Sequence, residues 1–367
     1  MIQKQFVEEI ICEYLNQRFC FLVGRGTTAI YLALKVIESK VGQGEVILPT
    51  ISCTSPAQVV YYSGFKPVFA DVNLTNFTLD IESLKSRITK ETKAILPIHI
   101  FGHCSQMNEI LEIAEECGIY VIEDAAQALG GNYKGKKIGS LGDFSILSFM
   151  GTKIINAGEG GAIVTDNEEF ASIIGNEVSR LPCKIHFYDY ALKSLSHRNL
   201  YHALADLLRV DNNFMLSSAF MAIIPFYSDI YIHEFSGDES TLRKIADGFK
   251  NLDADINQQI ERAMLYKNLL QDDNLVHPVG WESEGVVWRY SFLIKDTKKL
   301  IHITNELRKN GINASNHYWS VADLFYNEKT YSNTSYICPR ILNLWVDDNA
   351  DRAYIEKSCE IILKNLD

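Results

Sequence analysis

Short apolar runs rich in β-branched residues alternate with helix-like stretches over residues 19 to 165, and this alternation limits the possible folds most strongly. Helical stretches such as 28–39 and 105–117 lie between several of the runs. Strands that alternate with helices form βαβ units around a mostly parallel sheet that is covered on both faces. The sequence therefore predicts a large α/β domain with strands at residues 19–23, 45–49, 67–72, 94–100, 119–123, 144–149 and 161–165.

A different pattern follows residue 250. An amphipathic helix near 253–270 precedes apolar runs and further helical stretches, which predicts a smaller α+β domain. The expected strands are 286–294, 314–319 and 340–346, and helices are expected at 298–309 and from about residue 351. We therefore expect a large domain over 1–179, an irregular apolar insertion or bridge over 180–250 that serves as an interface, and a small domain over 251–367.

The composition is that of a globular protein. Apolar residues make up 47% and charged residues 22% of the 367 residues, which excludes a disordered chain. A net charge of -11 argues against a nucleic-acid partner, because phosphate neutralisation requires clustered Lys and Arg. The eight cysteines form no CxxC pair, so we expect no metal site, and without an apparent secretory signal they indicate reduced thiols in a cytoplasmic protein.

One apolar stretch, "FMLSSAFMAIIPFYS" at residues 214–228, raises the question of a membrane. It contains Pro225 and is shorter than the roughly 20 residues that a spanning helix needs, which disfavours a transmembrane anchor. We expect a buried or subunit-interface segment, and charged substitutions at Phe220 and Ile224 test it. Contact with a membrane surface is the less favoured alternative.

The first motif with chemical content is "VGRGTTAIYLAL", residues 23–34, where a strand ends and a helix begins. Gly26 allows a close backbone approach, and Thr27 and Thr28 supply hydroxyl and N–H groups at the positive end of the helix dipole. This arrangement suits a phosphate. An ordinary strand-to-helix turn capped by threonine remains an alternative at this point.

The second motif is "IYVIEDAAQALGG", residues 119–131. Its strand runs into Glu123 and Asp124, which places a carboxylate at the edge where open α/β sheets bind ligands, with Gln127 following closely. The alternative is that Asp124 only stabilises a helix N-terminus.

The third motif is "SFMGTKIINAGEGGAIVT", residues 148–165, in which Lys153 stands among small residues. A lysine here can contact phosphate, lie on the surface, or bond to an aldehyde through an amine with a lowered pKa. Ser148 could add a phosphate contact. Taken together, a helix N-terminus that suits a phosphate, a carboxylate at a strand end and this lysine are the set needed to hold pyridoxal 5′-phosphate.

These segments, together with "EVILPTISCTSPAQVVYYSGFKPVFADVN", resemble the DegT/DnrJ/EryC1/StrS family of sugar aminotransferases, closely over residues 20–165 and more loosely from about residue 251. The resemblance implies an aspartate-aminotransferase-like fold of type I. It also implies a homodimer with active sites at the subunit boundary, using L-glutamate to aminate a nucleotide-linked keto sugar.

The same resemblance implies roles for individual residues. Lys153 would bond covalently to the cofactor, Asp124 would pair with its pyridine nitrogen, and Gln127 would lie near its phenolic oxygen. The phosphate would be held by the threonines of the first motif, Thr27 and Thr28, and by Ser148.

Some positions depart from the family pattern. Cys53 stands where many members place an aromatic residue over the cofactor ring, and Met150 replaces a common histidine. His317 and Tyr318 could reach the substrate, although a strand of the small domain explains them equally well.

Three other functions stay open at this point. They are a sugar dehydratase, whose known relatives carry histidine in place of the lysine, an aminotransferase for a small phosphorylated ketone, and a non-enzymatic regulator or scaffold.

Overall fold

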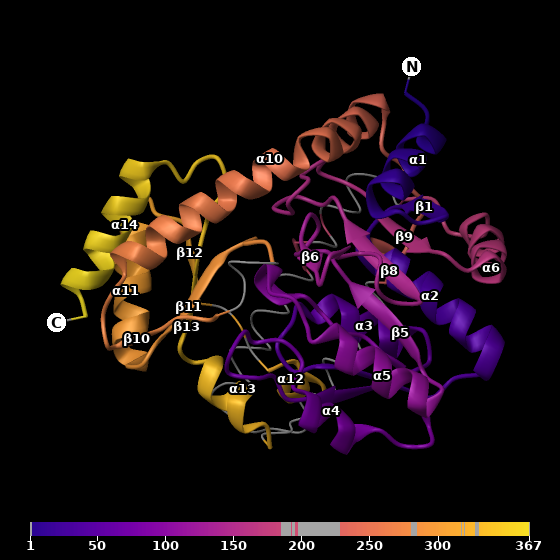
Figure 1. The fold of residues 1–367 in the computed structure, drawn as a ribbon, viewed down its shortest axis with the longest axis horizontal. Helices are drawn as coiled ribbons and strands as arrows, with labels where there is room; N and C mark the ends of the chain where they lie inside the picture. Colours follow the sequence, from indigo (N-terminus) through magenta and orange to yellow (C-terminus); the bar gives the residue numbers. More distant parts are fainter. Residues whose placement is uncertain are drawn as a thin grey trace.

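The computed structural model describes residues 2–184, 192, 195–196, 228–279, 285–316, 318, 320–326 and 330–366. The expected interface stretch 214–228 therefore lies outside the described residues except for Ser228, and so does His317. The chain forms two regions with separate sheets, joined by a long helix (Figure 1).

The larger region is built on a seven-stranded sheet in the order β1-β9-β8-β5-β4-β2-β3. Only β9 runs antiparallel to its neighbours, so the predicted mostly parallel sheet of seven strands is confirmed. The strands are β1 (Phe19–Val23), β2 (Glu45–Pro49), β3 (Lys66–Ala70), β4 (Thr92–Ile95), β5 (Tyr120–Asp124), β8 (Phe144–Ser148) and β9 (Gly161–Thr165). A short hairpin, β6 (Asn132–Tyr133) and β7 (Lys136–Lys137), lies outside the sheet.

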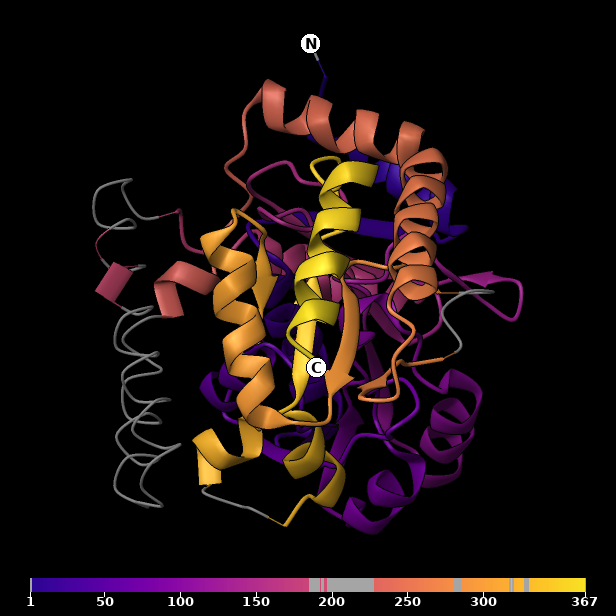
Figure 2. The ribbon, with the colours of Figure 1, turned by 90° about the vertical axis from the view of Figure 1, so that its left-hand side faces the viewer.

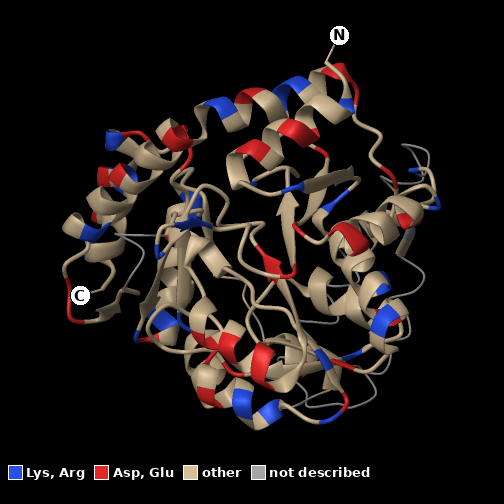
Figure 3. Cartoon of the chain, turned by 45° about the vertical axis from the view of Figure 1, so that its right-hand side comes forward, with Lys and Arg blue, Asp and Glu red and all other residues tan. Residues whose placement is uncertain are grey.

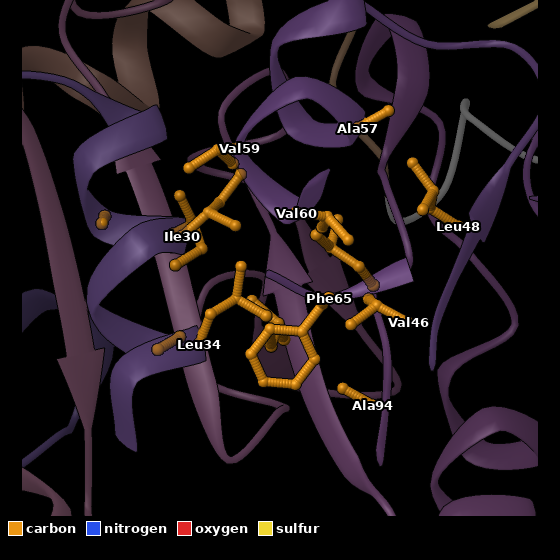
Figure 4. Close-up of a cluster of buried hydrophobic side chains, with 14 of the residues drawn as sticks. Ile30, Leu34, Val46, Leu48, Ala57, Val59, Val60, Phe65 and Ala94 are labelled. Carbon is orange, nitrogen blue, oxygen red and sulfur yellow. The ribbon is translucent and has the colours of Figure 1, made fainter. Parts of the chain in front are cut away.

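Helices bury both faces of this sheet, because successive strand residues point to opposite sides. In β2, for example, Val46 and Leu48 join one apolar cluster, shown in Figure 4, while Ile47 joins another. The first cluster contains side chains of α2 (Gly26–Val41), α3 (Thr54–Tyr62) and α6 (Glu168–Val178). The opposite face is covered by α1 (Lys4–Leu15), α4 (Ile81–Arg87) and α5 (Met107–Cys117).

The smaller region has an antiparallel sheet in the order β10-β11-β13-β12. Its strands are β10 (Leu275–Val276), β11 (Tyr290–Ile294), β12 (Ala314–Ser315) and β13 (Ile341–Leu344). Two helices, α11 (Thr297–Lys309) and α14 (Arg352–Lys364), pack with it into one apolar cluster (Figure 2). The predicted strands and helices of this region are present, although the strands are shorter than expected.

The connecting helix α10 (Glu239–Leu269) corrects the predicted division of the chain. It begins well before the expected start near Asp253, so the boundary placed at residue 250 falls inside a continuous helix. Its first half packs on the large region and its second half on the small one. Gly248 weakens the helical signal in the sequence, but its missing side chain makes room for Ile155, which a Cβ would approach to 2.6 Å.

A second correction concerns the expected small domain over 251–367. Helices α12 (Val321–Tyr326) and α13 (Ser332–Ile337) lie within this range, yet α12 packs into the core of the large region. The link is also polar: the Asp71 carboxylate, after β3, accepts hydrogen bonds from Asn333 N and from both Thr334 N and Thr334 Oγ1. The two regions are therefore tied together at this point as well as by α10.

Acidic and basic residues are intermixed along most of the described helices (Figure 3). In that part of the chain, no group of three or more His, Cys, Asp and Glu side chains could hold a metal ion. None of the helices found there has the length and apolar character needed to cross a membrane.

Candidate active site

The ends of four strands that run in the same direction bring the three sequence motifs to one edge of the large sheet. Gly26 follows β1, Cys53 follows β2, Asp124 ends β5 and Ser148 ends β8. All four residues line one cavity, together with Lys153. About 650 Å³ of space lies between these residues, and part of it is open solvent.

Lys153 lies in a turn after β8 and projects into this cavity. Burial lowers the pKa of its amine, and Arg289 adds to this effect, while the Asp124 carboxylate opposes it. The preceding residue, Thr152, has a φ of 75°, a strained value for a residue with a branched side chain. The Trp288 indole N–H donates to the Thr152 carbonyl, and the Lys153 Nζ lies 5.1 Å from the centre of the Trp288 ring.

Asp124 is 7% exposed, and one of its carboxylate oxygens accepts a hydrogen bond from Ala126 N at 2.9 Å. Burial raises the pKa of this carboxyl group, and the charge of Lys153 counteracts the shift. Gln127 also lines the cavity, and its Oε1 accepts from Phe101 N at 2.8 Å, which fixes the orientation of its amide.

The N-terminus of α2 approaches the ends of β8 and β9 closely. A Cβ on Gly161, the first residue of β9, would lie 2.3 Å from both the Arg25 carbonyl carbon and the Gly26 nitrogen, so only glycine fits there. The first N–H groups of a helix have no intrahelical acceptor. They lie at the cavity beside Ser148, an arrangement that suits an anion.

The two threonines of this turn are placed differently from the expectation. Thr28 is fully buried and is not among the residues that line the cavity, whereas Thr27 lines it. Both hydroxyls donate to the Tyr231 carbonyl, at 3.2 Å from Thr27 and 2.8 Å from Thr28. The threonine hydroxyls therefore hold the C-terminal end of α9 (Ser228–Tyr231).

The remaining predicted residues have varied surroundings. Cys53 lines the cavity and is exposed at the start of α3, with its Sγ 3.3 Å from Ser55 Oγ. Met150 lines the cavity too. Tyr318 packs edge-on against Phe101 at 4.8 Å and interacts electrostatically with Cys53, but it is not a lining residue of the cavity.

Four residues near the site were not singled out from the sequence. Arg25 and Tyr231 line the cavity, and the Arg25 guanidinium lies 5.5 Å from the Tyr231 ring. Trp288 and Arg289 come from the small region and reach the lysine turn. Arg25 could have been found from the sequence, because it is a basic residue inside the turn "VGRGTT". No local pattern pointed to the other three.

Pyridoxal phosphate fits the donor set of this cavity. A buried carboxylate suits its protonated ring nitrogen, a lysine with a lowered pKa suits its aldehyde, and a helix N-terminus beside Arg25 and Ser148 suits its phosphate. The Asp124 and Lys153 side chains both line this cavity and interact electrostatically.

Comparison with known families agrees with this geometry. Residues 3–180 match the DegT/DnrJ/EryC1/StrS aminotransferase family model. The match covers just under half of the chain. The matched range contains every motif on which the resemblance was based, from the turn at Gly26 to the lysine at position 153.

Curated relatives are similar to part of the chain, among them the following two. GDP-perosamine synthase of Caulobacter vibrioides is 42% identical over 166 residues, covering 45% of this chain and 44% of the relative. UDP-2-acetamido-2-deoxy-3-oxo-D-glucuronate aminotransferase of Pseudomonas aeruginosa is 36% identical over 172 residues, covering 46% and 47%. The chain thus spans less than half the length of the curated relatives it matches.

The fold comparison extends over the whole chain. Helicobacter pylori PseC, an aminotransferase involved in the biosynthesis of pseudoaminic acid, superposes with a TM-score of 0.77 at 19% identity, covering 100% of this chain and 91% of PseC. The predicted aspartate-aminotransferase-like architecture, with a large sheet and a smaller C-terminal region, is therefore confirmed.

Proposed function

We propose that this chain is an aminotransferase that uses pyridoxal 5′-phosphate to move an amino group from L-glutamate to a keto acceptor. The observation that carries the proposal is the meeting of Lys153, Asp124 and the N-terminus of α2 around one cavity. These groups come from three different strand ends, and each matches a different part of the cofactor.

Lys153 would serve as the covalent attachment point and as the group that moves protons during transfer. Its burial lowers the pKa of the amine, so that a larger fraction is neutral near physiological pH and able to accept a proton at Nζ. The Trp288 indole, bonded to the Thr152 carbonyl, restricts the turn that carries this amine. The cofactor, when bound, supplies an aldehyde that bonds to amines and a cationic ring that withdraws electrons.

Asp124 would keep that ring protonated. The carboxylate is buried and held by Ala126 N. Its hydrogen bond to a cationic ring nitrogen would therefore be stronger in the cavity than in water. Gln127, fixed by Phe101 N, would lie beside the ring, and Ser148 and Arg25 would hold the phosphate at the start of α2. These residues orient the cofactor, while Lys153 acts on the substrate.

For the acceptor we propose a nucleotide-linked keto sugar, used in the biosynthesis of a surface polysaccharide or glycoconjugate. Support comes from the names of the two curated relatives, which both refer to nucleotide sugars, and from their identity of 42% and 36% to this chain over 166 and 172 residues. We further propose that the enzyme is a cytoplasmic homodimer. The small phosphorylated ketone remains the alternative acceptor, and sugar dehydration the alternative reaction.

The test is spectroscopic and uses the full chain. The purified protein should bind pyridoxal phosphate, turn yellow and bleach with L-glutamate, and Lys153→Ala should abolish turnover without loss of the fold. Lys35→Ala, on the outer surface of α2, is a matched control that should behave like the wild type. A colourless protein that cannot be reconstituted would refute the proposal, and mass detection of the product separates an amine from a deoxygenated sugar.

A further inference from the structure

Trp288 is bonded to two strained positions of the backbone. Among the described residues, five that are not glycine have a positive φ, and Phe101 at 59° and Thr152 at 75° are two of them. The carbonyl groups of both accept a hydrogen bond from Trp288. Phe101 O is bonded to the Trp288 backbone N–H at 3.0 Å, and Thr152 O to the indole N–H. An aromatic or β-branched residue keeps such a φ only where the surrounding structure holds it.

These two strained residues support side chains that line the candidate active site. Thr152 immediately precedes Lys153 in the turn after β8. Phe101 lies in the short 3-10 helix η1 (Ile100–Gly102), and its N–H donates to the Oε1 of Gln127. Both Lys153 and Gln127 line the cavity. One tryptophan of the small region therefore bonds to the supports of two side chains of the large region.

The position of Trp288 is set by backbone contacts outside the cavity. The chain at 286–288 runs beside η1, where Val286 N donates to the Gly102 carbonyl at 3.3 Å in addition to the bond from Trp288 N. Gly102 has a φ of 97°, and a Cβ there would lie 2.2 Å from the Val286 carbonyl oxygen. Only glycine allows this close approach. The indole is therefore presented to the lysine turn from a backbone that is already fixed.

The lysine turn itself has few other restraints. Gly151 and Thr152 are exposed, and within the turn Lys153 N donates to the Met150 carbonyl at 3.1 Å. The indole ring of Trp288 also lies close to the reactive amine, with its centre 5.1 Å from Lys153 Nζ. If Thr152 relaxed to a negative φ, the peptide group before Lys153 would turn and the amine would move.

We propose that Trp288 is a positioning residue that holds Lys153 and Gln127 in a fixed arrangement around one cofactor. Its indole N–H holds the strained peptide before Lys153, and its backbone N–H holds the strained residue that orients Gln127. Such placement matters because a displacement of about 1 Å can cost on the order of 100-fold in rate. The inference rests on the proposed function, since it concerns the groups that would carry out that reaction.

The first measurement is the rate at which cofactor-free protein turns yellow after mixing with pyridoxal phosphate. In this step the Lys153 amine and the aldehyde form a C=N bond and release water. Trp288→Phe removes the indole N–H and keeps an aromatic ring. We expect it to slow attachment about tenfold and to lower kcat by about the same factor, with the KM for L-glutamate within about twofold. A role in stability alone would lower the urea midpoint and leave both rates unchanged.

Trp345→Phe is the matched control. Trp345 is also in the small region, and the guanidinium of Arg289 lies 4.4 Å from its ring centre and 4.5 Å from that of Trp288. The indole that bonds to the lysine turn is that of Trp288. The control should therefore keep the wild-type attachment rate and kcat.

Thr152→Gly tests the strain directly. Glycine adopts a positive φ without steric cost, so the turn no longer needs the indole to hold it. We expect Thr152→Gly combined with Trp288→Phe to recover most of the attachment rate that Trp288→Phe loses. Circular dichroism verifies the folding of each variant. If Trp288→Phe alone does not fold, the double variant is compared with Thr152→Gly, and the two should attach the cofactor at similar rates.

The inference is overturned if Trp288→Phe attaches the cofactor and turns over at the wild-type rates. It is also overturned if the added glycine restores nothing, or if the double variant attaches the cofactor much more slowly than Thr152→Gly. Each of these results would leave the aminotransferase intact, because Lys153 would still bind the cofactor in the wild type. A wild-type protein that never turns yellow would refute the proposed function instead.

Discussion

At the scale of single residues, Glu123 shows why two adjacent carboxylates of one strand have different roles. Its side chain is fully buried and accepts hydrogen bonds from Gly139 N and Leu141 N at 2.7 Å and from Ser145 Oγ at 2.7 Å. His99 donates through Nε2 at 3.2 Å, since its Nδ1 accepts from the Ser105 N–H. Glu123 therefore stabilises the fold beside Asp124 rather than facing the cavity.

This network predicts an acid-sensitive contribution to stability. Burial alone would raise the pKa of Glu123, but the hydrogen bonds from His99, Gly139 and Leu141 lower it below 4.5. The stabilisation is therefore complete above pH 4.5 and is lost as the pH falls through the lower pKa of the folded state. Glu123→Gln should reduce the free energy of unfolding by about 3 kcal/mol at pH 7 and flatten its decline in acid.

Urea unfolding at several pH values measures this effect. The exposed Glu82, which pairs with Lys85 on α4, provides the control variant Glu82→Gln. The control should change stability by less than about 0.5 kcal/mol. Equal acid profiles for Glu123→Gln and the wild type would contradict the assigned role.

At the scale of elements, the site depends on how closely α2 approaches β9. Gly161→Ala would place a Cβ 2.3 Å from the Arg25 carbonyl carbon and the Gly26 nitrogen, so the start of the helix must move. We expect a loss of about 2 kcal/mol in stability and weaker binding of pyridoxal phosphate, because the anion site moves with the helix. Thermal unfolding and a cofactor titration measure the two effects.

Gly151→Ala is the control for this prediction. Gly151 lies in the lysine turn, and a Cβ there would meet nothing within 4 Å. The control should therefore keep both stability and cofactor affinity. If Gly161→Ala does the same, the close approach of α2 to β9 does not shape the anion site.

At the scale of the whole molecule, the two regions should unfold together. All four tryptophans follow residue 280, so their fluorescence reports on the C-terminal part, whereas circular dichroism reports on both regions. The two transitions should coincide in urea for the wild type. Asp71→Ala removes the acceptor for Asn333 and Thr334 and should move the fluorescence transition to lower urea than the dichroism transition.

Asp80→Ala provides the comparison. Asp80 caps α4 within the large region by accepting from Ser83 N at 2.8 Å, and its loss should cost about 1 kcal/mol. Both transitions should then shift by the same amount. Separate transitions already in the wild type would show that α10 and α13 do not couple the regions.

The proposed homodimer also belongs to this scale. One chain has a mass of 41.6 kDa, and light scattering during gel filtration should give about twice that value. The charged substitutions at Phe220 and Ile224 lie outside the described residues, so they test the expected interface from the sequence alone. A monomer with full activity would contradict the proposed assembly.

Local patterns in the sequence were sufficient for much of the fold and for the centre of the site. Most residues of the large sheet are buried, so several of its strands appear as short apolar runs in the sequence, and β1, β2 and β9 have the predicted bounds. Lys153 and Asp124 were found because each ends or follows a strand, and strands in the same direction end at the same edge. The confirmed family match covers the same motifs.

The sequence by itself determined which segments form strands and helices, because backbone periodicity and caps act over a few residues. Only the tertiary structure decided how distant segments meet. The indole of Trp288 reaches Thr152 across 136 positions of sequence, α12 returns to the core of the large region, and Arg289 lies between two tryptophans. Such contacts depend on burying complementary surfaces, and no short-range spacing in the chain encodes them.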